Sequence, residues 1–360
     1  MVNVEIVWRN NMKKIICYVV LLFSILGLSS CTAITPTANK KEIVVTLYPE
    51  YQMVKAILGS DKVLNSIYDV KLIIPYGCDI HNYDPSMSDL LTIKKSYAFI
   101  YTSDSMEKWV SLLNFSEETT VLNLEKDERI ELIEMSEATE EHEEHSHEHG
   151  SNHKHEYDPH IWIYPVYAAY MVEEIRDLLI EITPDPYYPD SGIRQTIINN
   201  AQVYIDQLYD LDIAIKQIVS AAKVKTMYFA SPFAFYYWAY YYNLDYVLTY
   251  RTCSTEIDPS LSDITAIVEK MSKNNAKVIY SRELMSNQAA RMISESTGAK
   301  ILELHSGHNI SNKHVGLEEY TFINIMKRNI LNLAEGLEVD VEKIDNFVLR
   351  EEVNNESNPM

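Results

Sequence analysis

The sequence predicts an α/β protein of two lobes, each with a mainly parallel four-stranded sheet flanked by helices, joined by a long spine helix. Three observations support this fold class. Short apolar runs alternate with amphipathic segments between residues 42 and 124, and again between residues 225 and 336. Such βαβα series form mainly parallel sheets. Between them, residues 194–222 contain neither Pro nor Gly and carry apolar residues at three- and four-residue spacing, the pattern of one continuous helix.

The first series contains four β-rich apolar runs and the segments between them. The runs predict strands at residues 42–47, 70–75, 97–101 and 120–124. The intervening segments predict helices at residues 51–58, 85–95 and 106–113, with Gly59 ending the first. We expect residues 42–193 to form the N-terminal lobe.

The second series repeats this order after the spine helix. Its strands are predicted at residues 225–230, 246–250, 276–281 and 299–304, and its helices at 233–242, 259–273, 287–297 and 317–336. The expected domains are therefore a spine helix at 194–223, a C-terminal lobe at 224–336 and an acidic tail at 337–360. The spine would run about 43 Å at 1.5 Å per residue. The alternative, a coiled-coil dimer seam, has few heptads in one such segment, so we expect a monomer.

The first 31 residues read as a targeting segment. Met12, Lys13 and Lys14 precede the apolar run 15–28, and Leu28-Ser29-Ser30-Cys31 resembles a bacterial lipobox, in which the cysteine is lipid-modified after cleavage. The alternative is a short membrane helix, but the run is shorter than the roughly 20 residues that a span needs. Residues 32–41 would form a polar tether. We therefore expect an extracytoplasmic protein anchored to the cell membrane, with Cys78 and Cys253 kept and their pairing open.

Composition excludes several classes of function. A net charge of −21 disfavours nucleic-acid binding, which needs clustered Lys and Arg. The nine glycines are too widely spaced for a dinucleotide turn, a phosphate-binding loop or a nucleophile elbow. No C-x-x-C pair is present, so a zinc ribbon and a thioredoxin-type motif are also excluded.

Residues 137–156 form an acidic, histidine-rich segment without apolar periodicity, which predicts a mobile loop. Closely spaced imidazoles there suit loose binding of Zn²⁺ or similar ions. A solvated charge run without a role is the alternative. The six histidines are His142, His145, His147, His149, His153 and His155.

Two further histidines lie in contexts that predict order. His81 lies in a turn after the second predicted strand, and His160 lies where the histidine-rich loop re-enters the fold. Both positions are near the carboxyl ends of parallel strands, where α/β proteins bind ligands. A lone histidine is more often a core residue than a ligand, but the nearby histidine-rich loop favours metal ligation for both.

In these motifs the chain resembles the zinc and manganese solute-binding lipoproteins of bacterial ABC transporters, in particular the zinc-uptake type with a histidine-rich loop. The matches are the lipobox, Gly77-x-x-x-His81-x-Tyr83-x-Pro85-Ser86, the histidine-rich insertion, Asp158-Pro159-His160-Ile161-Trp162, the spine helix, Cys253-Ser254-x-Glu256, and Thr297-Gly298-Ala299-Lys300. The resemblance implies a metal bound in a cleft between two rigid lobes and handed to a membrane permease. It places His81 and His160 at the first two ligand positions.

The chain departs from this family at the third ligand. Zinc-binding relatives have a histidine that opens H-x-A-F-x-Y, whereas Pro232 stands here and cannot ligate. The fourth family position, often Asp, falls in the segment Leu304-His305-Ser306-Gly307-His308. We expect His308 rather than His305 to complete the site, with Glu256 or water as the remaining ligand. The alternative is that both His305 and His308 are exposed loop residues.

The sequence therefore predicts a lipid-anchored protein that captures Zn²⁺ and feeds an ABC importer, and it predicts no enzyme. Imidazole-rich coordination suits Zn²⁺ better than Mn²⁺, which is the second candidate cargo and prefers oxygen ligands. Two alternatives remain. A metal-dependent hydrolase would need an open coordination position and a positioned base, and a surface adhesin or metal buffer would bind metal without transport.

Overall fold

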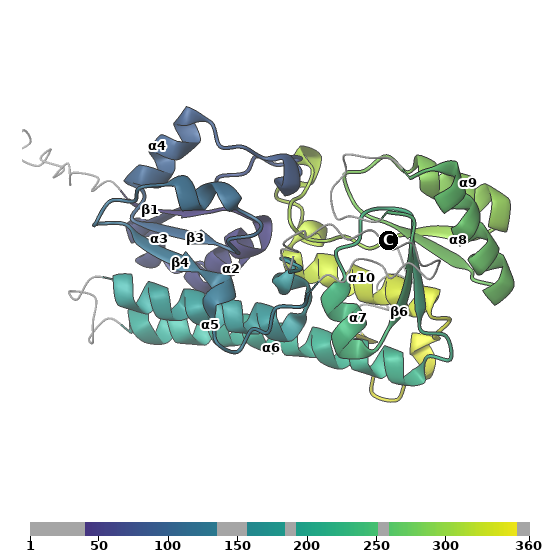
Figure 1. Ribbon diagram of the computed structural model, residues 1–360. Coiled ribbons are helices and arrows are strands. Elements are labelled where there is room, and N and C mark those ends of the chain that lie inside the picture. Colours follow the sequence, from purple (N-terminus) through teal and green to yellow (C-terminus); the bar gives the residue numbers. More distant parts are fainter. Residues whose placement is uncertain (1–39, 135–156, 184–191, 251–258, 351–360) are drawn as a thin grey trace, which may run out of the picture. The chain divides into compact units, whose positions relative to one another are not determined.

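The computed structural model describes residues 40–134, 157–183, 192–250 and 259–350. In these ranges it contains two four-stranded sheets in which every strand pair is parallel (Figure 1). Helices flank both sheets, and a 29-residue helix, α6 (Ile193–Ala221), follows the first sheet and precedes the second. The predicted fold class is therefore confirmed. Both lobes belong to one compact unit, which begins at Lys41.

The N-terminal sheet has the order β2-β1-β3-β4. Its strands are β1 (Lys41–Val45), β2 (Tyr68–Leu72), β3 (Ala98–Tyr101) and β4 (Thr120–Asn123). Helices α2 (Tyr48–Leu58), α3 (Leu64–Ile67) and α4 (Met87–Lys95) connect the strands. The helix predicted at 106–113 is instead a short 3₁₀ helix, η3 (Lys108–Leu112). Its N–H groups bond three residues back, as Val110 does to the Glu107 carbonyl at 2.8 Å.

Helix α2 begins at Tyr48, three residues before the predicted start. Pro49 occupies the first turn, where its missing N–H has no cost. The Glu50 carboxylate accepts hydrogen bonds from the backbone N–H groups of Thr46 at 3.0 Å and Leu47 at 2.9 Å. These bonds fix the chain between β1 and α2, at the carboxyl edge of the sheet.

The C-terminal sheet has the order β6-β5-β7-β8. Its strands are β5 (Thr226–Phe229), β6 (Asp245–Leu248), β7 (Val278–Ser281) and β8 (Lys300–Glu303). Helices α7 (Tyr236–Tyr242), α8 (Leu261–Asn274) and α9 (Gln288–Thr297) follow β5, β6 and β7. The helix predicted at 317–336 is divided into a 3₁₀ turn, η8 (Glu318–Tyr320), and helix α10 (Phe322–Gly336).

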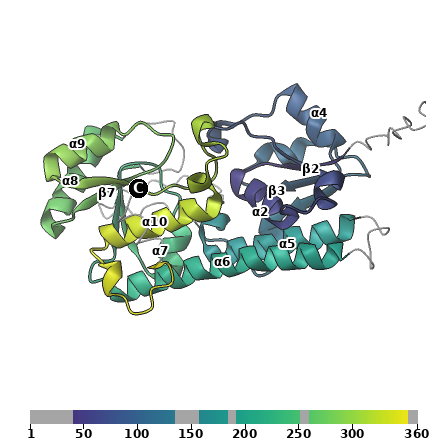
Figure 2. The same ribbon diagram turned by 180° about the vertical axis from the view of Figure 1, so that it is seen from behind.

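Helix α5 (Pro165–Ile182) is a second long helix that the sequence analysis does not predict. It packs along α6, and α6 also contacts α2 of the N-terminal lobe and α10 after the second sheet. Figure 2 shows α5 and α6 lying side by side beneath the N-terminal sheet, with α6 continuing under α10. In the described ranges, no helix has the length and apolar character needed to cross a membrane.

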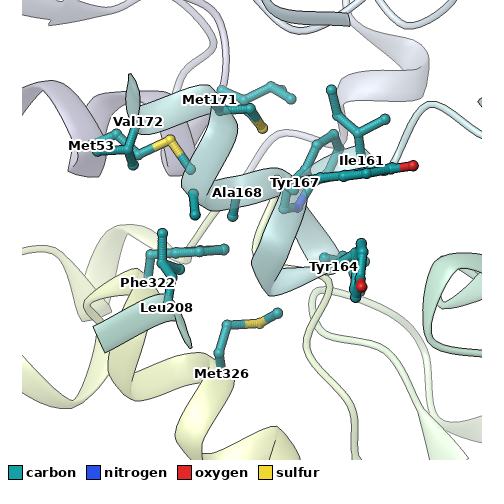
Figure 3. Close-up of a cluster of buried hydrophobic side chains, with 14 of the residues drawn as sticks. Met53, Ile161, Tyr164, Tyr167, Ala168, Met171, Val172, Leu208, Phe322 and Met326 are labelled. Carbon is teal, nitrogen blue, oxygen red and sulfur yellow. The ribbon is translucent and has the colours of Figure 1, made fainter. Parts of the chain in front are cut away.

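One buried core connects the helices of both lobes. Figure 3 shows Met53 of α2, Val172 of α5, Leu208 of α6 and both Phe322 and Met326 of α10 gathered around one point. All five side chains are at most 1% exposed, and full burial of each such side chain contributes roughly 1.5–3 kcal/mol. The lobes therefore meet on a shared apolar base.

The first part of the predicted tail is packed against the fold. Phe347 and Leu349 are buried, and the N–H of Val348 donates a 3.1 Å hydrogen bond to the side-chain oxygen of Gln217 on α6. This part of the acidic segment is therefore tied to the spine helix by a hydrogen bond and carries two buried apolar side chains.

Candidate metal centre

Three histidines from distant parts of the chain converge where the lobes meet. The rings of His81 and His160 have centroids 5.4 Å apart, and those of His81 and His308 are 6.5 Å apart. The Nε2 atoms of all three are buried and have no hydrogen-bond partner among the described residues. We call His81, His160 and His308 the three-histidine cluster. Buried ring nitrogens without a partner are rare in folded proteins, so their gathering at one place marks a ligand site.

His81 is held by the turn that follows β2. It lies in the 3₁₀ helix η2 (Ile80–Asn82), whose N-cap is Asp79. The Asp79 carboxylate accepts the backbone N–H of His81 at 3.0 Å. This local bond sets the direction in which the short turn presents the imidazole.

His160 is fully buried and is oriented by an aspartate two residues before it. Its Nδ1 lies 2.5 Å from the Oδ1 of Asp158. A carboxylate on one ring nitrogen fixes the tautomer and leaves the other nitrogen free for a ligand. Asp158 is itself held by its backbone, which donates to Ile133 at 2.9 Å and accepts the Tyr237 hydroxyl at 2.9 Å.

His308 follows β8 in the C-terminal lobe and is oriented in the same way. Its Nδ1 contacts the Ser306 hydroxyl and lies 3.0 Å from the Oε1 of Glu283. Glu283 also accepts the Ser306 N–H at 2.7 Å. Two of the three rings therefore have a carboxylate at Nδ1, and all three Nε2 atoms are left without a partner.

The electrostatics favour a neutral imidazole at His81. Burial and, after it, the positive charge of a protonated His160 lower the pKa of His81 to about 3. Burial would raise the pKa of Glu283, but its histidine and arginine neighbours, beginning with His305, lower it well below its ordinary value. A neutral ring beside a carboxylate is the state that binds a divalent cation without first losing a proton.

One histidine pair of the cluster has the spacing that a tetrahedral ion requires, and a second pair is too far apart. At the usual Zn–N distance of 2.0–2.1 Å, two imidazoles on one ion have ring centres about 5 Å apart. The pair His81 and His160, from one lobe, meets this spacing at 5.4 Å, whereas the 6.5 Å from His81 to His308 is wider. Within the described ranges, no group of three or more His, Cys, Asp or Glu side chains is already arranged to hold a metal ion. A shift of His308 of roughly 1 Å towards His81 would give this second pair the same spacing as the first.

His305 is buried but lies outside the cluster. Its Nδ1 accepts the Gly307 N–H at 2.9 Å, and its backbone forms two hydrogen bonds with Asn329 of α10. Burial lowers its pKa to about 4. His305 therefore supports the loop that carries His308.

Pro232 is buried after β5, beside buried Phe233 and Phe235, so this edge of the second sheet offers no donor side chain at that position. Other predicted site residues lie outside the described residues. They are Cys31, Cys253, Glu256 and the loop histidines His142, His145, His147, His149, His153 and His155.

The sequence analysis missed several neighbours of the cluster. Asp79 and Arg282 form an ion pair at 3.1 Å between the two lobes, and Glu283 supports His308 from the adjacent strand end. Their place in the chain could have identified two of them, because Arg282 and Glu283 directly follow strand β7, at the sheet edge where ligands bind.

Known proteins resemble this chain in fold and in sequence. A family model described as zinc-uptake complex component A, periplasmic (ZnuA), matches residues 43–336. The zinc-binding lipoprotein AdcA of Streptococcus pneumoniae is 30% identical over 341 residues, covering 93% of this chain and 64% of AdcA. This chain thus spans less than two thirds of the AdcA length.

Two further relatives match over most of their length. The high-affinity zinc uptake system protein ZnuA of Bacillus subtilis is 31% identical over 302 residues, covering 83% of this chain and 88% of that protein. The Zn(II)-bound ZnuA-like domain of Streptococcus pneumoniae AdcA superposes with a TM-score of 0.64 at 27% identity, covering 83% of this chain and 100% of that domain. The family model covers both lobes and the helices between them, so this chain belongs to the ZnuA family, the periplasmic component A of zinc-uptake complexes.

Proposed function

We propose that this chain captures Zn²⁺ outside the cytoplasm with the three-histidine cluster and delivers it to the permease of an ABC importer. The observation that carries the proposal is the convergence of three buried, unpartnered Nε2 atoms from two lobes. An unsatisfied buried polar group costs about 1–3 kcal/mol. A cation that binds all three nitrogens would remove that cost, and it would join the lobes at the same time.

The donor set favours zinc as the cargo. Imidazole nitrogen is a preferred ligand of Zn²⁺, whereas Mn²⁺ prefers carboxylate, carbonyl and water oxygens. The named relatives are zinc-binding and zinc-uptake proteins. Their names also describe binding and uptake rather than turnover, and we accordingly propose a binding protein and no hydrolase.

The residues that flank the histidine-rich segment connect it to the proposed site. Glu134 and Tyr157 pair in an antiparallel bridge, and the N–H of Asp158 bonds the Ile133 carbonyl at 2.9 Å. The described residues on either side of residues 135–156 are therefore paired with each other, a few residues before His160. Metal held loosely by the loop histidines would be released next to the three-histidine cluster.

Zinc content after dialysis tests the binding half of the proposal. A chain that starts at residue 32 and lacks residues 137–156 is expected to keep one zinc ion per molecule, and His160→Ala is expected to lose it. His314→Ala is the matched control, because His314 stacks on Tyr320 with ring centroids 3.6 Å apart and takes no part in the cluster. Zinc retained by His160→Ala at the wild-type level would contradict the proposal.

Delivery of zinc to an importer is tested in cells, with the membrane-anchored protein. Zinc uptake at limiting zinc is expected to fail in cells that lack this chain, and to be restored by the wild type but not by His160→Ala. Cys31→Ala is expected to move the protein from the membrane fraction into the soluble fraction. A Cys31→Ala protein that stays processed and membrane-bound would contradict the lipid anchor.

A further inference from the structure

An aspartate beside the three-histidine cluster is tied to the opposite lobe. Asp79 precedes His81 in the N-terminal lobe, and its Oδ2 lies 3.1 Å from the Nη2 of Arg282, which follows β7 in the C-terminal lobe. The Arg282 side chain is 1% exposed, and that of Asp79 is 21% exposed. The second oxygen of Asp79, Oδ1, lies 4.0 Å from the Nε2 of His308.

Three carboxylates surround the cluster, and they approach it from different sides. Asp158 contacts the Nδ1 of His160, and Glu283 contacts the Nδ1 of His308. Both therefore hold the rings from behind, away from the free nitrogens. Asp79 is the carboxylate that approaches an Nε2 atom, the side on which an ion would bind.

Three imidazoles do not complete the four-donor shell that zinc sites usually have. This inference rests on the proposed function. We propose that Asp79 supplies the fourth donor through Oδ1 and that Arg282 is the positioning residue that holds the carboxylate there. Two donors on one tetrahedral Zn²⁺ are about 3.3 Å apart. The 4.0 Å between Oδ1 and the Nε2 of His308 is close to this value.

The role of Arg282 follows from its hydrogen bonding. One of its nitrogens binds Asp79 Oδ2. Oδ1 accepts the backbone N–H of His81 at 3.0 Å and keeps a second lone pair with which it can bind the metal. Ligating carboxylates are commonly oriented by such an outer hydrogen bond. Because Arg282 and Asp79 belong to different lobes, the metal, the carboxylate and the guanidinium would form a second connection across the junction besides His308.

Charge also fits a carboxylate donor better than an added anion. Asp79, Asp158 and Glu283 together carry three negative charges, and Arg282 carries one positive charge. A Zn²⁺ ion bound among them brings the group to neutrality without any further anion. Overall neutrality of the ion and its charged neighbours favours binding at a buried site, since uncompensated buried charge is strongly unfavourable.

The test compares zinc affinity and the spectrum of Co²⁺ in the chain lacking residues 137–156. Asp79→Asn is expected to weaken zinc binding at least tenfold and to change the visible d–d bands of bound Co²⁺, because an oxygen donor is altered. Asp69→Asn, at an exposed position of β2, is the matched control with no expected change. Arg282→Gln is expected to weaken binding, and Arg282→Lys, which keeps the charge and one donor, is expected to restore most of it.

The outcomes separate this inference from the proposed function. If Asp79→Asn keeps the wild-type zinc affinity and cobalt spectrum while His160→Ala loses the metal, Asp79 is no ligand and the proposed function stands. A loss in Glu256→Gln together with a silent Asp79→Asn would assign the oxygen donor to Glu256 and overturn the inference. If the wild type itself holds no zinc, the proposed function fails. Melting temperatures of the metal-free variants show whether each has folded.

Discussion

The indole N–H of Trp162 donates a 2.8 Å hydrogen bond to the backbone carbonyl of Ser306, 144 residues away. Trp162 lies two residues after His160, and Ser306 lies two residues before His308. The bond therefore joins the two loops that present these histidines from different lobes. Both partners are buried, so the bond is shielded from competing water.

Trp162→Phe removes this bond and keeps an aromatic ring in the core. We expect the free energy of unfolding to fall by about 1 kcal/mol for the lost hydrogen bond, with a further loss from the smaller ring. We also expect zinc affinity to fall severalfold, because the His160 and His308 loops are no longer tied together. Urea unfolding and a chelator-competition titration measure the two effects.

Trp238→Phe is the control for this prediction. Its indole donates an equivalent 2.8 Å bond to the carbonyl of Ile163, which is not part of the loop that carries His308. A similar loss of stability with unchanged zinc affinity is expected. Equal affinities in the two variants would show that the Trp162 bond does not couple the loops.

Two buried glutamates predict how stability depends on pH. The Thr46 hydroxyl lies 3.0 Å from the Oε2 of Glu50 and 2.6 Å from the Oε1 of Glu107. One hydroxyl has a single proton to donate, so it cannot satisfy two carboxylates at once. Burial raises the pKa of Glu50 to about 7 and that of Glu107 to about 8, from an ordinary 4.5. The pair therefore holds at least one proton near neutral pH.

A raised carboxylate pKa means that the folded chain binds more protons than the unfolded chain between about pH 4.5 and 8. The free energy of unfolding should therefore fall as pH rises through this window. His81 and His305 have lowered pKa values, so they act with the opposite sign, and their contribution is complete above about pH 6.5. Denaturation of the metal-free chain at pH 7 and pH 9 isolates the glutamate pair.

Glu50→Gln is the variant that best tests the pair. Its amide oxygen can accept the N–H groups of Thr46 and Leu47, and its amide nitrogen can donate to the Thr102 hydroxyl, so each contact of Glu50 keeps a partner. We expect the stability lost between pH 7 and pH 9 to shrink by about 1 kcal/mol. Glu118→Gln, at an exposed position, should keep the wild-type slope. An unchanged slope in Glu50→Gln would contradict the shared proton.

The sequence was sufficient to predict the sheets, because apolar runs and their spacing determine which segments are buried on both faces. It did not reveal α5, although Pro165 starts this helix and Ala168, Met171, Val172 and Ile175 recur at helical spacing. The N-terminal half of α5 is apolar or aromatic on nearly every face, so no polar face stands out there.

Position near the predicted strand ends and the adjacent histidine-rich segment identified His81 and His160 as candidates, and the resemblance to the solute-binding family identified His308. The supporting contacts could not be predicted, because they join segments that meet only when the lobes pack together. The pair Asp79 and Arg282 is separated by 203 residues, and neither residue belongs to a spacing pattern. His305 and His308 differ in that the Nδ1 of His305 accepts the nearby Gly307 N–H, whereas the Nε2 of His308 is buried without a hydrogen-bond partner.

Removal of residues 137–156 separates loose from tight zinc binding. We expect fewer zinc ions per chain and one remaining tight site, because the sequence of residues 137–156 predicts loose binding by its closely spaced histidines, whereas hydrogen bonds of the fold hold His81 and His160. Calorimetry resolves the two phases. Loss of the tight phase on loop deletion alone would move the principal site into the loop.

The central claim is that histidines from both lobes hold one zinc ion, and the zinc dissociation constant of His308→Ala tests it most directly. Measured in the chain lacking residues 137–156, it is predicted to rise at least tenfold, or about 1.4 kcal/mol, while the melting temperature of the metal-free variant stays within a few degrees of wild type. Wild-type affinity in His308→Ala, with the loss appearing in His305→Ala instead, would contradict the account.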